Sequence, residues 1–206
     1  MSGVLDFLSP SLATDERGFH PVARSSVARL YEAADATFEE RDGWRVAVYV
    51  RGEADSLRAV GIADVSHLAK LEVRPAPAAL AGDGITTYRI SPRRALVLCP
   101  ESSRDAVVGE VAGADLVLDV TAAYTVLAVS GPQARALIAR LTHLHHFPSG
   151  GEVAHVTAHV LPSGNGFRIA VAQELGHYLG EVALDCAQAL GGGLVGVDAL
   201  PPGERP

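Results

Sequence analysis

The sequence predicts an α+β fold made of two ferredoxin-like βαββαβ units in tandem. Short apolar runs of strand character alternate with segments of helical spacing, and their order is strand, helix, strand, strand, helix, strand, twice over. A similar tripeptide precedes each repeat, Asp64-Val65-Ser66 in one and Asp119-Val120-Thr121 in the other. A true duplication and a chance match both remain open for so short a pair. The predicted organisation is an extended arm over residues 1–24, a first unit over 25–122, a second unit over 123–200 and a tail over 201–206.

The segment before the first repeat shows three local patterns. Apolar residues recur at helical spacing after Ser25 and Ser26, either of which can act as the N-cap. A strand-like alternation follows, and then a short helical stretch that Gly61 ends. We expect a helix over 25–37, a strand over 44–50 and a short helix over 53–60.

The two repeats are assigned from period-2 and period-3.6 patterns and from their turn residues. Pro132 suits the first turn of a helix, where its missing N–H leaves no bond unmade. The glycines at 191–193 are typical of a helix stop, not of a phosphate loop, because no Gly-Lys-Ser/Thr follows. In the first repeat we expect strands over 69–74, 85–90, 95–99 and 115–120, with helices over 75–80 and 102–111. In the second we expect strands over 125–130, 153–161, 167–171 and 194–197, with helices over 132–141 and 173–190.

The composition argues against several classes of protein. Hydrophobic residues make up 48% and charged residues 20% of the 206 residues, an ordinary globular balance. A net charge of -7 without grouped Lys and Arg disfavours nucleic-acid binding. Two distant cysteines, Cys99 and Cys186, do not form a disulfide framework. With no secretory leader pattern and no long apolar run, we expect a cytoplasmic chain that does not enter the membrane.

Four stretches, in order, resemble the glycine-cleavage T-protein (aminomethyltransferase) family and cover about residues 27–200. The most specific is Gly-Ile-Ala-Asp-Val-Ser-His at 61–67, continued by Lys-Leu-Glu-Val at 70–73. The others are Leu-Tyr-Glu at 30–32 with Asp-Gly-Trp at 42–44, Leu-Ala-Val-Ser-Gly-Pro-Gln-Ala-Arg at 127–135, and Gly-Val-Asp-Ala-Leu at 196–200. The resemblance implies a fold whose members bind tetrahydrofolate in a three-domain ring and transfer a one-carbon unit from an amine.

The same resemblance gives the candidate site residues. It implies Asp83, Tyr88, His67 and Ser66 as tetrahydrofolate-binding residues, with Asp83 the single candidate for a catalytic role. Asp83 stands at the first of the family's two Asp positions and Gly84 at the second, so Asp83 can equally be a turn residue in Gly82-Asp83-Gly84. For His67 the alternative is packing, and for Ser66 it is capping of a turn.

Departures from the family pattern point to a shortened member. The segment between the signature and the Tyr88 strand is reduced to 76–81, and Leu-Pro-Ser-Gly-Asn-Gly at 161–166 replaces the family's Gly-Tyr-Thr-Gly-Glu. The sequence also ends before the family's third domain would begin. These losses resemble the small gamma subunit of heterotetrameric sarcosine oxidase. Leu-Asp-Val-Thr at 118–121 and Leu-His at 144–145 fit that subunit too.

Two functions from different classes follow from this resemblance. One is a non-catalytic gamma-like subunit of a folate-linked, amine-oxidising complex, with flavoprotein sarcosine-oxidase-type subunits or a second copy as partner. It predicts an exposed apolar docking patch. The alternative is a tetrahydrofolate-binding aminomethyltransferase, acting alone or completed by a second chain. It predicts an open cleft lined by Asp83, Tyr88 and His67.

A group of histidines is the densest set of titratable residues. Metal sites of this kind normally include cysteine or a carboxylate at characteristic spacing, and Glu152 is the one acid close by. We therefore expect no metal, and we interpret the group as loop or interface histidines, with a small metal-binding protein as a third alternative. The group consists of His143, His145, His146, His155 and His159.

Overall fold

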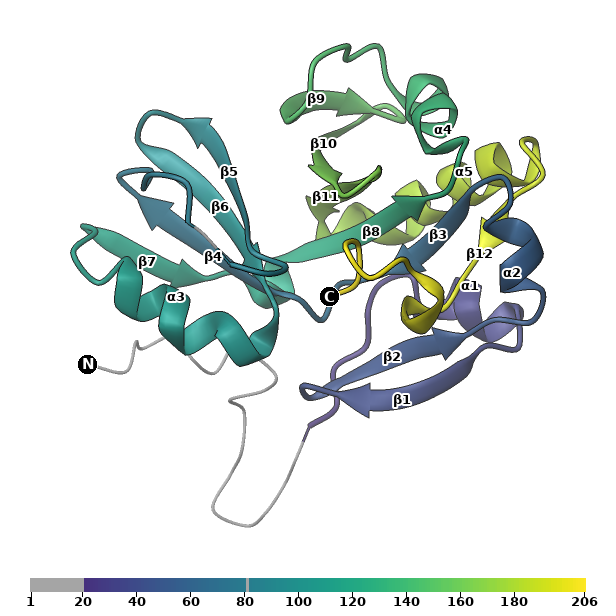
Figure 1. Cartoon of the computed structure of the whole chain (residues 1–206), viewed down its shortest axis with the longest axis horizontal. Coiled ribbons are helices and arrows are strands. Elements are labelled where there is room, and N and C mark those ends of the chain that lie inside the picture. The colour runs from purple at the N-terminus through teal and green to yellow at the C-terminus, as the bar shows by residue number, and fades with distance from the viewer. Residues whose placement is uncertain (1–20, 81) are drawn as a thin grey trace.

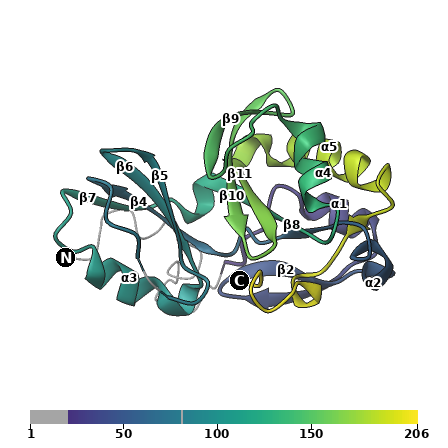
Figure 2. The ribbon, with the colours of Figure 1, turned by 45° about the horizontal axis from the view of Figure 1, so that its top comes forward.

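The computed structural model describes residues 21–80 and 82–206. A four-stranded sheet and a six-stranded sheet stand side by side, and a two-stranded hairpin packs near their junction (Figure 1). Helices α4 and α5 lie with the six-stranded sheet, whereas α3 lies with the four-stranded one (Figure 2). The α+β class predicted from the sequence is confirmed.

The four-stranded sheet has the strand order of a ferredoxin-like unit. Its order is β5-β6-β4-β7, and every neighbouring pair is antiparallel. In chain order this is second, third, first, fourth, as in a βαββαβ unit. Its elements are β4 (Ala69–Arg74), β5 (Thr86–Ser91), β6 (Arg94–Cys99), the 3-10 turn η3 (Glu101–Ser103), α3 (Arg104–Glu110) and β7 (Leu116–Asp119).

The predicted helix over 75–80 is wrong. After β4 the chain runs without regular structure to residue 80. Pro75 and Pro77 explain this, because each lacks an N–H and Pro77 also disfavours the helical conformation of Ala76. Over residues 75–80 and 82–85 the unit therefore has no helix in place of its expected first one.

The six-stranded sheet contains the four strands of the second unit together with two added strands, β3 and β9. Its order is β12-β3-β8-β11-β10-β9. Without β3 and β9, the remaining order is β12-β8-β11-β10. Numbered along the chain within the unit, these are its fourth, first, third and second strands, which is the order of the four-stranded sheet written in reverse. The elements are β3 (Gly61–Asp64), β8 (Tyr124–Ser130), α4 (Ala134–Leu141), β9 (Ser149–Val153), β10 (Val156–Ser163), β11 (Gly166–Ala172), η5 (Gln173–Leu175), α5 (Gly176–Gln188), β12 (Gly193–Leu194) and η6 (Val197–Ala199).

Strand β3 changes the predicted organisation. It lies between β12, to which it is parallel, and β8, to which it is antiparallel. A boundary between residues 122 and 123 therefore does not separate the sheets, because residues 61–64 of the first half complete the sheet of the second. Two smaller corrections concern strand ends. The single strand expected over 153–161 is the hairpin β9–β10, and the strand expected over 194–197 is the two-residue β12 followed by η6.

The N-terminal described segment forms a helix and a hairpin. Its elements are α1 (Ala28–Ala33), β1 (Thr37–Arg41), β2 (Trp44–Tyr49) and α2 (Glu53–Ser56). Asp42 and Gly43 join β1 to β2 with φ of 52° and 73°, the left-handed pair that a tight hairpin turn requires. Ala23 bridges to Trp44. The extended arm predicted over 1–24 lies outside the described residues as far as residue 20.

Two hydrophobic clusters cover the two faces of the six-stranded sheet. Helices α4, α5 and α1 pack on one face, for example through Leu137, Leu179 and Tyr31. The other face packs against the hairpin and the four-stranded sheet, where Trp44 and Tyr88 join one cluster. No helix in the described part of the chain is long and apolar enough to cross a membrane.

Candidate functional site

The chain passes between the two sheets twice, and the two crossings make equivalent hydrogen bonds. The first crossing leads from β3 to β4 and the second from β7 to β8. Val65 N–H donates to the Val126 carbonyl at 2.9 Å, and Val120 N–H donates to the Lys70 carbonyl at 2.8 Å. The crossings therefore lie side by side as an irregular antiparallel ladder.

A hydroxyl and a carboxylate fix each crossing in the same way. Ser66 Oγ accepts a hydrogen bond from Val126 N–H, and Thr121 Oγ1 accepts one from Lys70 N–H, both at 3.0 Å. Asp64 Oδ1 accepts from Ser66 N–H at 3.1 Å and from Ser66 Oγ at 2.6 Å, whereas Asp119 Oδ1 accepts from Thr121 N–H at 2.8 Å. This equivalence supports a true duplication of the Asp-Val-Ser and Asp-Val-Thr tripeptides.

Lys70 is a fully buried amine at this crossing. Its Nζ donates to the carbonyls of Ser66 at 2.6 Å and Leu68 at 2.8 Å. Burial lowers the pKa of Lys70 to about 7, against the opposing pull of Asp64 and Asp119. Burial also raises the pKa of Asp64, although Ser66 favours its charged form. The crossing thus holds ionisable groups out of water.

A cavity of about 260 Å³ lies beside the crossing. His67 and Leu68 of the first crossing form part of its wall, and η6 with residues 205–206 forms another part. Its lining consists of Arg41, Asp42, His67, Leu68, Pro100, Glu101, Ser102, Val197, Asp198, Arg205 and Pro206. Five separate parts of the chain therefore meet around a polar cavity.

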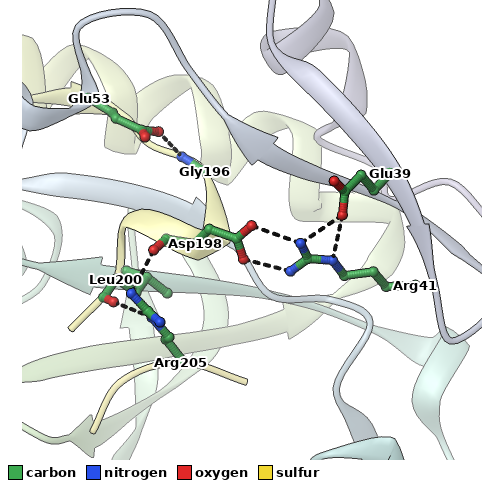
Figure 3. A network of polar contacts seen from close by, with 7 residues as sticks. All are labelled: Glu39, Arg41, Glu53, Gly196, Asp198, Leu200 and Arg205. Carbon is green, nitrogen blue, oxygen red and sulfur yellow. Dashed lines mark hydrogen bonds and ion pairs between the residues drawn. The ribbon is translucent and has the colours of Figure 1, made fainter. Parts of the chain in front are cut away.

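An ion-pair network holds two walls of this cavity together. Arg41 donates to both carboxylate oxygens of Asp198, at 2.6 and 2.8 Å, and also to Glu39 (Figure 3). Arg205 donates to the carbonyls of Leu200 at 2.7 Å and Asp198 at 2.8 Å. The hairpin β1–β2 is thereby fastened to η6 and to the residues after it.

His67 is a buried, neutral imidazole in the cavity wall. Burial lowers its pKa to about 4, and the charges of Lys70, Arg41 and Arg168 act in the same direction. At neutral pH the ring can donate one hydrogen bond and accept another, but it carries no charge. It can orient a polar ligand but cannot neutralise an anion.

The other candidate site residues do not line this cavity. Ser66 is buried within the crossing, where it makes the hydrogen bonds described above. Tyr88 is buried between the sheets against the ring of His159, with 5.1 Å between centroids. Asp83 is exposed in the turn between Gly82 and Gly84. Of the four, the structure places only His67 in the lining of this cavity.

Sequence reasoning missed Arg168 on β11, which is 1% exposed. Its Nε has no hydrogen-bond partner, and its two Nη atoms reach Thr86 Oγ1 and the Arg205 carbonyl only at 3.4 Å. Burial lowers the pKa of Arg168, and the nearby Glu204 carboxylate opposes that shift. The sequence signal that could have identified it is a single arginine within the otherwise apolar strand β11.

Glu204 is the second residue that sequence reasoning missed. It is 4% exposed, and its Oε1 accepts a hydrogen bond from Asn165 N–H at 3.1 Å. A Cβ at Gly164 would lie 2.7 Å from Glu204 Cγ, and one at Gly166 would lie 3.1 Å from Glu204 Oε2. The turn that lacks the family's glutamate in sequence therefore receives a carboxylate from residue 204.

The histidines predicted as a group are dispersed. His159 faces Tyr88, His145 and His146 line a shallow pocket near Phe147, and His143 and His155 line a cavity of about 420 Å³ at the end of α4. Over residues 21–80 and 82–206, no three His, Cys, Asp or Glu side chains are arranged to hold a metal ion.

The exposed apolar patch expected for partner docking is not found in the described residues. The large hydrophobic side chains exposed there are Val22, Tyr49 and Tyr178, which come from three separate segments.

The paired units and the interlocked sheets define a T-protein-type fold. No protein-family model matches the sequence, and no curated protein sequence matches it significantly. Solved structures supply the particular relatives. Glycine cleavage system aminomethyltransferase T from Bartonella henselae aligns with a TM-score of 0.67 and 20% identity over 86% of this chain. The chain spans 60% of the length of that protein.

A second solved structure shares the fold at closer to full length. It is a chain of heterotetrameric sarcosine oxidase from Corynebacterium sp. U-96, in complex with pyrrole 2-carboxylate. It aligns with a TM-score of 0.58 and 20% identity, over 82% of this chain and 96% of that one. The two chains are thus of similar length. These likenesses confirm the fold that the sequence resemblance implied.

Proposed function

We propose that the chain is a non-catalytic subunit of a folate-linked, amine-oxidising assembly of the sarcosine-oxidase type. The observation that carries the proposal is the packed space between the two sheets. Tyr88 and Leu161 are core residues there, and the adjoining cavity of about 260 Å³ is smaller than the roughly 300–1,000 Å³ typical of small-molecule sites. A site for a molecule as large as tetrahydrofolate requires this interior to open.

The separation of the candidate residues also supports a non-catalytic role. A folate transferase needs its carboxylate close to the reacting amine. Asp83 is exposed in a turn, whereas His67 lies in the cavity wall. The carboxylates that line the cavity include Asp198, but both of its oxygens already accept hydrogen bonds from the Arg41 guanidinium.

The assembly part of the proposal rests on the solved relative of similar length. That relative belongs to a heterotetramer. By analogy, the partners would be flavoprotein subunits that oxidise a small amine. Tetrahydrofolate would then be bound elsewhere in the complex or with the help of a second chain.

Two measurements on the full chain test the proposal. In the first, the chain is co-expressed with sarcosine-oxidase-type flavoprotein subunits from the same genome. We expect co-elution with flavin absorbance on a sizing column, and amine-dependent oxygen uptake that falls when the chain is left out. Separate elution and unchanged oxygen uptake would contradict the proposal.

The second measurement is a calorimetric titration of the isolated chain with tetrahydrofolate. We expect no binding up to millimolar ligand. Micromolar binding that Asp83→Ala weakens would instead support the folate-dependent aminomethyltransferase. Asp105→Ala, on the exposed side of α3, is the matched control for loss of a surface carboxylate.

A further inference from the structure

The segment 201–206 folds back into the centre of the molecule. Its chain end lies between the two sheets in both views (Figures 1 and 2). Glu204 N–H and Arg205 N–H both donate to the Pro201 carbonyl, at 2.9 and 3.2 Å, so the segment makes one tight turn. This turn directs the Glu204 side chain into the protein.

The Glu204 carboxylate is buried against the turn at 164–166, and this position is called the recess below. Asn165 N–H donates to it, and the two flanking glycines leave the room that a Cβ would take. Arg168 supplies the nearby positive charge, and no ion pair within 4.0 Å joins the two groups. The recess therefore combines a backbone donor, a shape that fits a carboxylate and a buried guanidinium.

Arg168 itself is incompletely satisfied. A guanidinium that binds a carboxylate well does so through two parallel bonds of about 2.7–2.9 Å. Arg168 instead makes two contacts of 3.4 Å to neutral oxygens and leaves Nε without a partner. A buried cation in this condition is costly unless an anion completes it. Arg168 thus has the environment of a cation in an anion-binding site whose hydrogen bonds the protein's own groups satisfy only in part.

The recess and the His67 cavity share one wall. The carbonyl of Arg205 accepts a bond from Arg168, while the Arg205 side chain and Pro206 line the cavity. Displacement of residues 204–206 removes this wall and joins Arg168 to a space that already holds the neutral His67. The combined space has a cation at one end and a hydrogen-bonding imidazole at the other.

We propose that Arg168 and the turn at 164–166 form a binding site for a small free carboxylate, and that Glu204 occupies this site as an internal ligand that an external carboxylate displaces. The segment 201–206 is then a strap that closes the site. This inference does not depend on the proposed partner subunits.

The test compares acetate with chloride at equal ionic strength and neutral pH. In Glu204→Ala the recess is empty, and we expect acetate to raise the Tm in a saturable way. In the wild-type chain Glu204 already occupies the site, so acetate has to displace it. An internal occupancy of about nine-tenths makes the apparent Kd for acetate about tenfold weaker than in Glu204→Ala. Glu204→Ala combined with Arg168→Met should lose the response, and the exposed control Glu174→Ala should behave as the wild type.

Two results would overturn the site. One is an equal acetate response with and without Arg168, and the other is no acetate-specific response in Glu204→Ala. If that variant does not fold, hydrogen exchange on the unaltered chain decides. Acetate should speed exchange of the Glu204 and Arg205 amides and leave the Ala189 amide of α5, bonded to Asp185, unchanged. Equal exchange in acetate and chloride would exclude displacement of the strap.

Discussion

At the scale of single residues, the interior of this protein is unusually rich in ionisable groups. Lys70, Asp64 and Arg168 are all buried, yet none of the three makes an ion pair within 4.0 Å among the described residues. Backbone carbonyls and hydroxyls take the place of counter-ions, as in the bonds from Lys70 Nζ. Each group therefore links stability to pH through its displaced pKa.

Lys70 gives the clearest pH dependence. Its native pKa of about 7 lies below the ordinary 10.5, so between these values the unfolded chain binds a proton that the native chain does not. The free energy of unfolding should therefore rise with pH above 7, by at most about 1.4 kcal/mol per pH unit. Urea denaturation from pH 7 to 9 measures this slope.

The control is Lys70→Met, which keeps an unbranched side chain only one atom shorter and removes the titration. Its slope between pH 7 and 9 should be flatter than that of the wild type, whatever its absolute stability. Parallel curves for the two proteins would show that Lys70 does not carry the effect.

At the scale of elements, a strand could be predicted where its own residues show its burial. It was missed where exposure or pairing with distant strands decides its structure. Strand β4 was predicted with its observed bounds, because its residues are buried on both faces and its neighbours are strongly apolar. Strand β1, Thr-Phe-Glu-Glu-Arg, was missed because it is largely exposed and charged. Strand β3 was missed because Gly61 was interpreted as a helix stop, whereas pairing with β8 and β12 makes it a strand.

The residues of the candidate site were identified or missed for the same reason. His67 was identified because it belongs to a contiguous motif, and the structure places it in the cavity wall. Arg168 and Glu204 were missed because nothing local relates residues 36 apart, which meet only after β11 and the final turn are in place. Tyr88 was placed in a site by family resemblance, but its neighbour His159 belongs to the other sheet. Short-range patterns cannot show such contacts.

The hydrogen bonds of the two crossings give a testable prediction about stability. Ser66→Ala removes the acceptor of Val126 N–H and a donor to Asp64, and Thr121→Ala removes the acceptor of Lys70 N–H. Each should lower the free energy of unfolding by about 1–3 kcal/mol, because a buried polar group loses its partner. Chemical denaturation provides the measurement, with the exposed Ser102→Ala as control. A loss no larger than that of the control would refute the proposed role of these hydroxyls.

At the scale of the whole molecule, the two sheets form one folding unit. β3 belongs to the first half of the sequence but fills the gap between β12 and β8. The hydrophobic cluster that contains Trp44 and Tyr88 also takes residues from both sheets and the hairpin. The second half of the sequence therefore lacks one strand of its own sheet. The four-stranded sheet has one cluster of its own with α3, but its other face shares a core with the six-stranded sheet.

A fragment of residues 123–206 therefore should not fold alone. It retains β8 and β12 but not β3, so β12 has no partner and the edge of β8 is unpaired and apolar. We expect low chemical-shift dispersion and aggregation, whereas residues 21–206 should unfold in one cooperative transition. Well-dispersed amide signals from the fragment would contradict this view.

The paired crossings also determine how fast a molecule can reach the interior. Opening the two sheets like a hinge would break the backbone bonds of Val65 and Val120 together with those of Ser66 and Thr121. Release of the strap at 201–206 breaks the bonds of Glu204 and Arg205 but leaves both crossings and both sheets in place. A carboxylate entering at Arg168 should therefore wait for the strap, and its observed association rate should level off at high concentration, at the rate with which the strap detaches.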